Sequence, residues 1–275
     1  MPPVNSMDYS GKDTVLDVVR KESADFFKLV DDPNNWNVQT RCTEWEVRDL
    51  VGHMIDVTEG YLVRWEKARK KEPIDTAGLL VMGESLNRNA KAFRSLPPQE
   101  AIDRLKADYT KMMDVFEKLT ADEWSGFMVT HPYMGPLPTL FYPAFHVMDY
   151  GVHTWDIRWG LGEKTRKLDE RTAGVLIPYM LFALLPSTVD VRSAMGIDTR
   201  YGIEISGEWG GKWQASVKDG KFEAKPENDS FGGCEAIFSF DPSDFVLTAF
   251  QRFPGGAARG DHEVIDKVRH MFFRI

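Results

Sequence analysis

Cysteine is scarce in this chain, whose 275 residues include only Cys42 and Cys234. The two lie far apart and outside any C-x-x-C pattern, which is typical of a protein without structural disulfides in a reducing compartment. The N-terminus lacks the basic and then apolar profile of a signal peptide. The longest apolar stretch, residues 175–186, is too short to cross a bilayer. We therefore expect a cytoplasmic protein with no membrane partner.

Positive charge is also in short supply, because 34 lysines and arginines face 42 acidic residues and leave a net charge of −8. Binding to nucleic acid requires clustered cations. The one basic stretch, residues 64–71, is interrupted by glutamate and is interpreted as a solvated helix end. Neither a P-loop nor a dinucleotide-binding or G-x-S-x-G motif occurs. These absences argue against a nucleic-acid partner, a bound nucleotide and a serine hydrolase of that type.

Apolar residues recur at helical spacing through the first 160 residues. A capping-box sequence at Thr43–Glu46 predicts the start of one helix, because each side chain can bond the backbone N–H of the other residue. Glycine and proline punctuate residues 72–84 and 126–138, which predicts connecting loops. The predicted helices cover residues 13–30, 43–70, 86–96, 99–119 and 140–159. Several helices of this length joined by loops indicate an antiparallel bundle.

The pattern changes after Gly162. Residues 169–185 predict one apolar helix, and from residue 202 apolar and polar residues alternate as in half-buried strands. Turns are predicted at Gly210-Gly211 and Lys218–Lys221. The predicted strands cover residues 202–209, 212–217 and 236–240, and two closing helices cover 242–251 and 262–273. The chain is therefore predicted to be α+β with two domains, a helical one over 1–162 and an α+β one over 163–275.

Two of the six histidines and an aspartate share the short stretch FHVMDYGVHTW at residues 145–155. On a helix that turns about 100° per residue, His146, Asp149 and His153 fall within an arc of about 60°. Asp149 and His153 form a D-x-x-x-H pair, which can chelate one metal ion from a single helix. His146 is expected to be a fourth ligand, a proton shuttle or a solvent-exposed neighbour.

A third metal ligand is expected from another helix, because catalytic zinc sites usually keep three protein ligands and one open position. His53 is the best candidate, since it lies at the edge of the apolar arc of its helix. The alternatives are a hydrogen-bonded core histidine at 53 and a surface pair of His146 with Asp149. Burying His53, Asp149 and His153 without a cation would be costly, which favours the metal. Asp156 is expected either to accept the ring N–H of His153 or to be a surface aspartate.

Three other residues belong to the segments around the predicted metal ligands. Gly60, two turns after His53, lacks a side chain and leaves room for a substrate. His131, in the loop rich in glycine and proline, is expected either to close over a substrate or to be an ordinary loop histidine. Cys42 precedes the capping-box sequence, where an apolar residue is expected, so we interpret it as a small hydrophobic residue.

Residues 40–54, TRCTEWEVRDLVGHM, resemble the N-terminal signature of the mycothiol-dependent maleylpyruvate isomerase family. Residues 149–157, DYGVHTWDI, are similar to the E-x-x-x-H-x-x-D-L segment of that family. The C-terminal half resembles the sterol-carrier-protein-like domain that follows in the same family, through Ala249–Arg252 and Gly260-Asp261. The resemblance extends over nearly the whole chain.

The resemblance implies a DinB-like antiparallel four-helix bundle over residues 1–162 and a smaller sterol-carrier-protein-like α+β domain over 163–275. It also implies a divalent metal, typically zinc, held by His53, Asp149 and His153, whose open position accepts a low-molecular-weight thiol such as mycothiol. A metal lowers the pKa of a bound thiol, so the sulfur is ready to attack at neutral pH. The implied reactions are cis–trans isomerisation through thiol addition and elimination, and thiol transfer onto a small electrophilic substrate.

Arg252 matches an arginine of the family, so it is expected either to clamp a substrate carboxylate or to be a surface charge at a helix end. With His146 and Asp156 it completes the predicted catalytic residues. Two positions depart from the family pattern. Asp149 stands where the family has glutamate, and its shorter side chain requires a closer approach of the helix or leaves a weaker metal site. Gln251 stands where the family has glycine, which weakens the assignment of Arg252.

Two other functions stay open. A non-catalytic binder would hold an apolar or lipid ligand in the second domain and keep a structural metal. Its cavity would be lined by Val175, Leu176, Ile177, Met180, Leu181 and Phe182. A metal-dependent hydrolase would instead use a metal-bound water directly, without a thiol.

Overall fold

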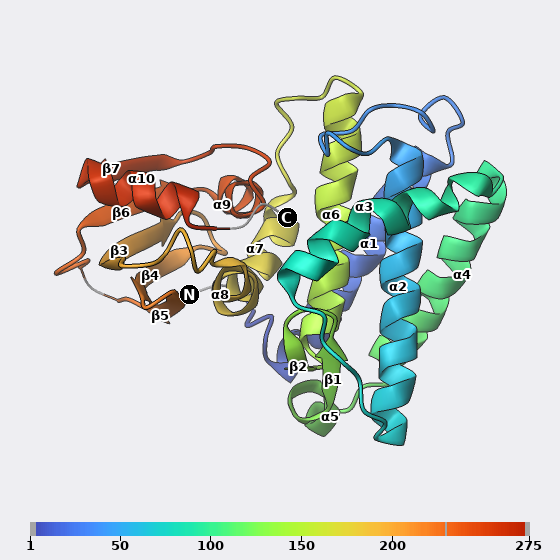
Figure 1. The fold of residues 1–275 in the computed structure, drawn as a ribbon, viewed down its shortest axis with the longest axis horizontal. Helices are drawn as coiled ribbons and strands as arrows, with labels where there is room; N and C mark the ends of the chain where they lie inside the picture. The colour runs from blue at the N-terminus through green and yellow to red at the C-terminus, as the bar shows by residue number, and fades with distance from the viewer. Residues whose placement is uncertain (1–3, 229, 273–275) are drawn as a thin grey trace. The chain divides into compact units, whose positions relative to one another are not determined.

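The computed structural model describes residues 4–228 and 230–272. These residues form two compact units, one of residues 7–166 and one of residues 4–6 with the described residues from 167 onward. The first unit is mainly helical and the second contains the principal sheet (Figure 1). The prediction of an α+β chain with a helical first part and a sheet-rich second part is therefore confirmed.

Four long helices build the described part of the first unit and share one apolar core. They are α1 (Lys12–Val30), α2 (Val47–Lys70), α4 (Pro98–Glu117) and α6 (Phe141–Gly160). Each contributes fully buried side chains to the core, such as Phe26, Leu50, Leu105 and Tyr150. The shorter helical segments are η1 (Tyr9–Gly11), α3 (Leu79–Ala92), η2 (Phe93–Ser95) and α5 (Ala121–Gly126). This core fixes the relative position of α2 and α6, which carry the predicted metal ligands.

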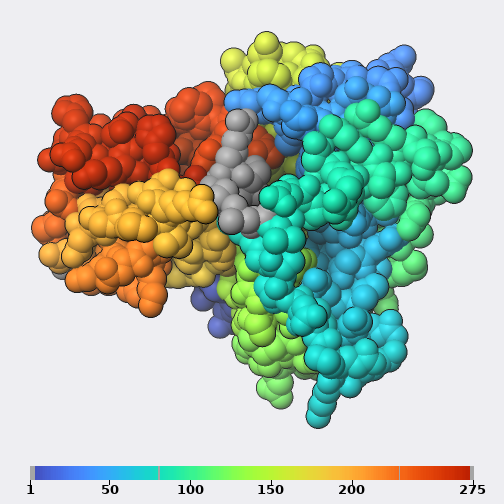
Figure 2. Space-filling model, in the orientation of Figure 1, coloured from blue at the N-terminus to red at the C-terminus, as the bar shows by residue number. Residues whose placement is uncertain are grey.

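Helix α3 packs closely against α2. A Cβ atom on Gly52 would lie 2.2 Å from the carbonyl oxygen of Ala90, so only glycine permits this approach. In the space-filling view, atoms of the segment 71–92 lie over α2 (Figure 2). Helix α3 begins at Leu79, earlier than the predicted residue 86, because Gly78 takes up a positive φ of 80° immediately before it.

The predicted capping box at Thr43 is wrong by one turn. Helix α2 begins at Val47, and the backbone N–H of Glu46 donates to Asp49 Oδ2 at 3.0 Å. The residues before it form a turn that Gln39 closes by pairing with Glu46 in an antiparallel bridge. The Thr40 hydroxyl donates to the carbonyl of Trp45 at 2.7 Å, which holds that residue outside the helix.

A two-stranded hairpin replaces most of the loop predicted at 126–138. Strands β1 (Met128–His131) and β2 (Gly135–Pro138) pair antiparallel, with His131 opposite Gly135. Proline is tolerated in β2 because a two-stranded ribbon leaves one edge of each strand unpaired. The hairpin packs against α2 and therefore brings His131 beside that helix.

The described part of the second unit contains a five-stranded sheet of order β5-β4-β3-β6-β7. Its strands are β3 (Asp198–Ile205), β4 (Gly211–Lys218), β5 (Lys221–Pro226), β6 (Ala236–Phe240) and β7 (Ala257–Gly260). The β3–β6 pair is parallel and the other pairs are antiparallel. Asp219 and Gly220 form the predicted turn between β4 and β5, with φ of 50° and 71°. Strands β5 and β7 were not predicted, because both are short and half polar.

The helices of the second unit are α7 (Glu170–Tyr179), α8 (Leu185–Thr188), α9 (Pro242–Ala249) and α10 (His262–His270). A π-helical turn, η3 (Met180–Leu184), separates α7 from α8. Pro178 lies just before this turn and lacks the N–H of a regular helix, which accounts for the change in helical hydrogen bonding. Among the described residues, no helix is long and apolar enough to cross a membrane.

Candidate metal centre

Helices α2 and α6 bring the three predicted metal ligands together. One donor atom each of His53, Asp149 and His153 lies within 4.8 Å of the other two. The two imidazole rings meet edge to face, with centroids 5.2 Å apart and planes at 89°. Only 8% of His53 and 6% of His153 is exposed, while Asp149 keeps an intermediate exposure. The two imidazoles and the carboxylate of the predicted ligands thus surround one position in the structure.

The donor set fits a divalent cation. Two nitrogen or oxygen donors about 2.1 Å from one ion lie at most about 4.2 Å apart, so donors within 4.8 Å need only a small movement to bind it. Among the described residues, no hydrogen bond or ion pair is found to the Asp149 carboxylate. Two imidazoles and a carboxylate suit zinc and related transition metals. A cation is the natural complement of this arrangement.

Burial raises the pKa of Asp149 to about 6, and the nearby His153 opposes this rise. The ordinary pKa of an aspartate is near 4, so the surroundings disfavour its negative charge. A bound cation would reverse this effect, because a positive charge at the carboxylate favours its ionised form.

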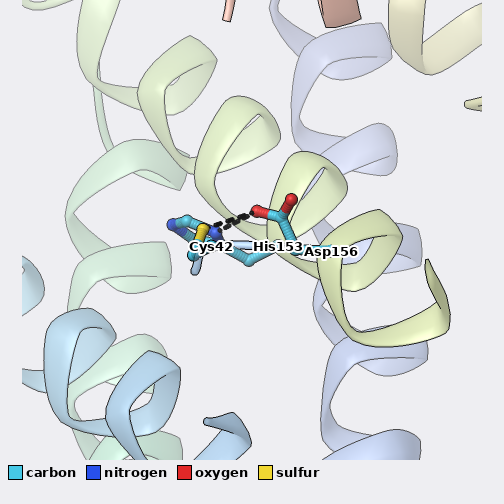
Figure 3. Close-up of side chains that lie close together, drawn as sticks. All are labelled: Cys42, His153 and Asp156. Carbon is cyan, nitrogen blue, oxygen red and sulfur yellow. Dashed lines mark hydrogen bonds and ion pairs between the residues drawn. The ribbon is translucent and has the colours of Figure 1, made fainter. Parts of the chain in front are cut away.

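Asp156 supports His153 through the Nδ1 atom of the imidazole ring. Its Oδ2 atom lies 3.0 Å from His153 Nδ1 and 3.2 Å from Cys42 Sγ (Figure 3). A carboxylate only accepts hydrogen bonds, so Nδ1 carries the proton and Nε2 is left with a lone pair for a metal. Asp156 is fully buried, so it is not the surface aspartate of the alternative interpretation.

Cys42 has a polar role that the sequence did not predict. Its thiol donates to the same Asp156 oxygen that accepts the His153 proton. The backbone N–H of Arg41 donates to the carbonyl of Asp156 at 3.1 Å, so the segment before α2 is tied to α6 at this residue. The sequence offered little indication of this hydrogen bond, because 114 residues separate Cys42 from Asp156. A second group of possible metal donors, Cys42, His153 and Asp156, results from these contacts.

His146 is buried one turn before Asp149, with 1% of its surface exposed. Its Nδ1 lies 3.1 Å from the carbonyl oxygen of Tyr142, and its buried Nε2 has no hydrogen-bond partner among the described residues. Burial lowers the pKa of His146 to about 4, so the ring is neutral near pH 7. Because the carbonyl requires a proton on Nδ1, Nε2 is a bare acceptor. The expectation of a solvent-exposed His146 is wrong, and His146 does not belong to either group of clustered metal donors among the described residues.

His131 ends β1 and packs against α2. Its Nε2 lies 3.2 Å from the hydroxyl of Tyr61, and its ring centroid lies 4.4 Å from that of Tyr133. Burial lowers the pKa of His131 to about 3, with a further contribution from the charge of Arg64. His131 is 2% exposed, so it is not an ordinary loop histidine. Gly60, in contrast, faces open space, since no atom lies within 4 Å of a Cβ built there.

Arg252 belongs to the second unit and follows α9. Only 8% of it is exposed, and its Nη1 donates to the carbonyl of Phe250 at 3.2 Å. The alternative of a surface charge at a helix end is therefore wrong. A role of Arg252 toward a substrate stays a prediction.

The second unit holds an apolar cavity of about 520 Å³. Aromatic side chains such as Tyr201, Phe238 and Phe245 line it, with Arg269 and His270 among its polar residues. The six residues predicted to line a cavity, 175–177 and 180–182, do not. Most of them are buried in α7 and η3, and Phe182 is 41% exposed. Residues 175–177, 180 and 181 therefore build core, and of the apolar run at 175–186 only Leu185 lines this cavity.

Comparison with known proteins identifies a family and a similar fold. A family model described as the mycothiol maleylpyruvate isomerase N-terminal domain matches residues 16–158, more than half of the chain. Two crystal structures match with a TM-score of 0.59 and 12% identity, covering 91% of this chain and 94% of theirs. They are the mycothiol-dependent maleylpyruvate isomerase and a histidine-to-alanine mutant of it. At this identity the likeness shows the fold alone. No curated protein sequence matches the chain.

Proposed function

This chain belongs to the family of the mycothiol maleylpyruvate isomerase N-terminal domain, and we propose that it is a metal-dependent enzyme acting with a low-molecular-weight thiol. The proposed reaction is cis–trans isomerisation of a small electrophilic substrate or transfer of the thiol onto it. The observation that carries the proposal is the convergence of His53, Asp149 and His153 within 4.8 Å. A divalent cation held by these residues, zinc for this donor set, supplies a Lewis acid that lowers the pKa of a bound thiol.

The residues around the three donors have distinct roles in this proposal. Asp156 fixes the tautomer and orientation of His153, so that Nε2 faces the metal position. His146 offers a buried lone pair on Nε2 one turn from Asp149, which suits it to accept a hydrogen bond from the thiol or the substrate. Its low pKa keeps this atom unprotonated near pH 7.

Arg252 is proposed to bind a carboxylate of the substrate. Its guanidinium is planar and permanently charged, which matches the fork of a carboxylate. Support comes from the resemblance of residues 249–252 to the arginine-bearing segment of the family.

The proposal is tested by elemental analysis of chelator-free protein, followed by incubation with mycothiol and maleylpyruvate. About one divalent ion per chain and thiol-dependent formation of product are expected. His153→Ala should lose the metal and the activity together. Full retention of metal by that variant would refute the ligand assignment, and turnover without any thiol would indicate a hydrolase instead.

A second candidate function is supported by the cavity of the second unit. Its volume of about 520 Å³ and its aromatic lining suit a small apolar molecule. In this alternative the protein binds a ligand without transforming it, and the metal is structural. Retention of a thiol by the metal would favour the enzyme, and a metal without an exchangeable ligand would favour the binder.

A further inference from the structure

Arg64 is a half-buried arginine on α2. The basic stretch at residues 64–71 does form a largely exposed helix end, but Arg64 itself is only partly exposed. Its Nη1 donates to the backbone carbonyls of Thr130 at 3.0 Å and Asp75 at 3.5 Å. Among the described residues, no carboxylate pairs with it. A guanidinium held between a hairpin and a connecting segment therefore keeps its positive charge and its Nε and Nη2 donors available for an anion.

The Tyr61–His131 pair lies beside this arginine. Tyr61 precedes Arg64 by one turn of α2, and its hydroxyl lies 3.2 Å from His131 Nε2. Both side chains are buried, with 5% and 2% exposed, and His131 Nδ1 has no hydrogen-bond partner among the described residues. When the phenol donates to Nε2, the ring proton resides on Nδ1, which becomes an unpaired buried donor. Burying such a donor costs free energy of folding unless it donates a hydrogen bond to a ligand or a water molecule.

Ring contacts connect these residues to α6, which carries two of the predicted metal ligands. Tyr61 is two turns from His53, about 12 Å along the helix axis. His131 and His146 flank the ring of Tyr61, with centroid distances of 5.8 and 6.0 Å. His146 is one turn from Asp149 on α6. Burial raises the pKa of Tyr61 well above its ordinary value, and the nearby charge of Asp149 raises it further, consistent with this geometry. Tyr61 therefore lies between Arg64 on its own helix and the segment of α6 that carries Asp149.

We propose that Arg64, Tyr61 and His131 form a binding subsite for a carboxylate. Arg64 supplies the positive charge and His131 Nδ1 the directed hydrogen bond, while Tyr61 fixes the tautomer of His131. The identity of the ligand, the carboxylate end of a small unsaturated acid, rests on the proposed function. Its electrophilic end would then face Asp149.

The test uses maleate, a small unsaturated dicarboxylate, as the probe. Binding is measured by calorimetry on the full chain, both metal-loaded and stripped with a chelator. Arg64→Gln should weaken maleate binding at least about tenfold, the factor expected for one charged hydrogen bond. Tyr61→Phe should weaken it less. Lys67→Gln, one turn further along α2 and exposed, makes the same charge change and should leave binding within about twofold of the native protein.

The proposal is overturned if the native protein does not bind maleate, or if Arg64→Gln binds it as well as Lys67→Gln does. Should Arg64→Gln fail to fold, Arg64→Lys serves instead, because it keeps the charge and loses the planar fork. Failure of the proposed function looks different. If the native protein binds no metal but Arg64→Gln still weakens maleate binding, the subsite is supported and the proposed metal-dependent function is refuted. If the protein binds metal and shows thiol-dependent turnover but Arg64→Gln leaves maleate binding unchanged, the proposed function is supported and the subsite is refuted.

Discussion

Cys42 and Asp156 are hydrogen-bonded across 114 residues of chain, with Sγ 3.2 Å from Oδ2. The same carboxylate oxygen accepts the ring proton of His153 at 3.0 Å. A residue interpreted as a small hydrophobic one is thus linked through a single carboxylate to a predicted metal ligand. If the predicted site binds a metal, its affinity would therefore depend on a residue outside both of the helices that carry the predicted ligands.

Asp156→Ala is expected to lower the affinity for zinc by about 10- to 100-fold, the usual effect of losing a residue that orients a metal-bound histidine. The ring of His153 would keep its place but lose its preferred tautomer. Competition with a chromophoric chelator measures the affinity. An unchanged affinity in a folded variant would mean that the hydrogen bond has no part in metal binding.

Cys42→Ala should weaken zinc binding by less than about tenfold, because the residue acts through Asp156 rather than on the histidine itself. Cys42→Ser replaces the thiol by a hydroxyl donor and should restore most of the affinity. Equal affinities of the alanine and serine variants would show that Cys42 only fills space. The unfolding temperature of the metal-free proteins separates this effect from a loss of stability.

Asp149→Glu is expected to preserve or tighten metal binding if the geometry follows the family pattern, since glutamate is the family's residue at this position. Elemental analysis after dialysis against a weak chelator measures the retained metal. A folded variant that has lost its metal would show that the shorter side chain is built into this site.

His146→Phe is expected to change the pH dependence of stability. Burial lowers the pKa of His146 to about 4, while the unfolded chain keeps a value near 6.5. The stability that the neutral ring contributes is therefore complete above pH 6.5 and is lost as the pH falls toward 4. His131 acts in the same direction, with a pKa of about 3. Asp149 acts in the opposite direction, since its raised pKa of about 6 gives stability that is lost as the pH rises.

His146→Phe removes the proton that His146 takes up when the chain unfolds between pH 4 and 6.5. The free energy of unfolding of the variant should therefore vary less with pH than that of the native protein. The expected difference in slope between pH 6.5 and 4.5 is about 1.4 kcal/mol per pH unit. Urea titrations of the metal-free proteins measure it. Parallel pH profiles would indicate that His146 is already protonated in the folded protein. At pH 7 the variant should be at least as stable as the native protein, because it removes a bare buried acceptor.

Gly52→Ala and Gly60→Ala form a matched pair on α2. A Cβ at residue 52 would lie 2.2 Å from the carbonyl of Ala90, so this variant should lose roughly 1–3 kcal/mol of stability. A Cβ at residue 60 meets nothing within 4 Å, so this variant should gain up to about 1 kcal/mol from helix propensity. Thermal unfolding compares the two, and similar losses would contradict the close approach of α3 to α2.

The convergence of the three metal donors was predictable because it depends on local helical geometry. The spacing of Asp149 and His153 fixes their common face on one helix, and the apolar arc of α2 turns His53 toward the core. The structure brings these groups together. Binding of a metal by them stays a prediction, since it depends on chemistry that helix periodicity does not encode.

Contacts between distant segments were not predictable. The bond from Cys42 to Asp156 and the placement of His131 beside Tyr61 depend on how the turn before α2 and the β1–β2 hairpin pack. The start of α2 was placed one turn early because Thr43 and Glu46 both have side chains that can cap a helix. The turn closed by Gln39 and Thr40 decided between them.

The placement of His53 and His153 on separate helices has a mechanical consequence. An ion shared by them would act as a cross-link closing a loop of roughly 100 residues, of a length for which a chain-entropy estimate reaches about 4.7 kcal/mol for a disulfide. Helices α3, η2, α4 and α5 and the β1–β2 hairpin lie inside that loop. Loss of the ion would therefore loosen the entire helical unit rather than the immediate surroundings of two imidazoles.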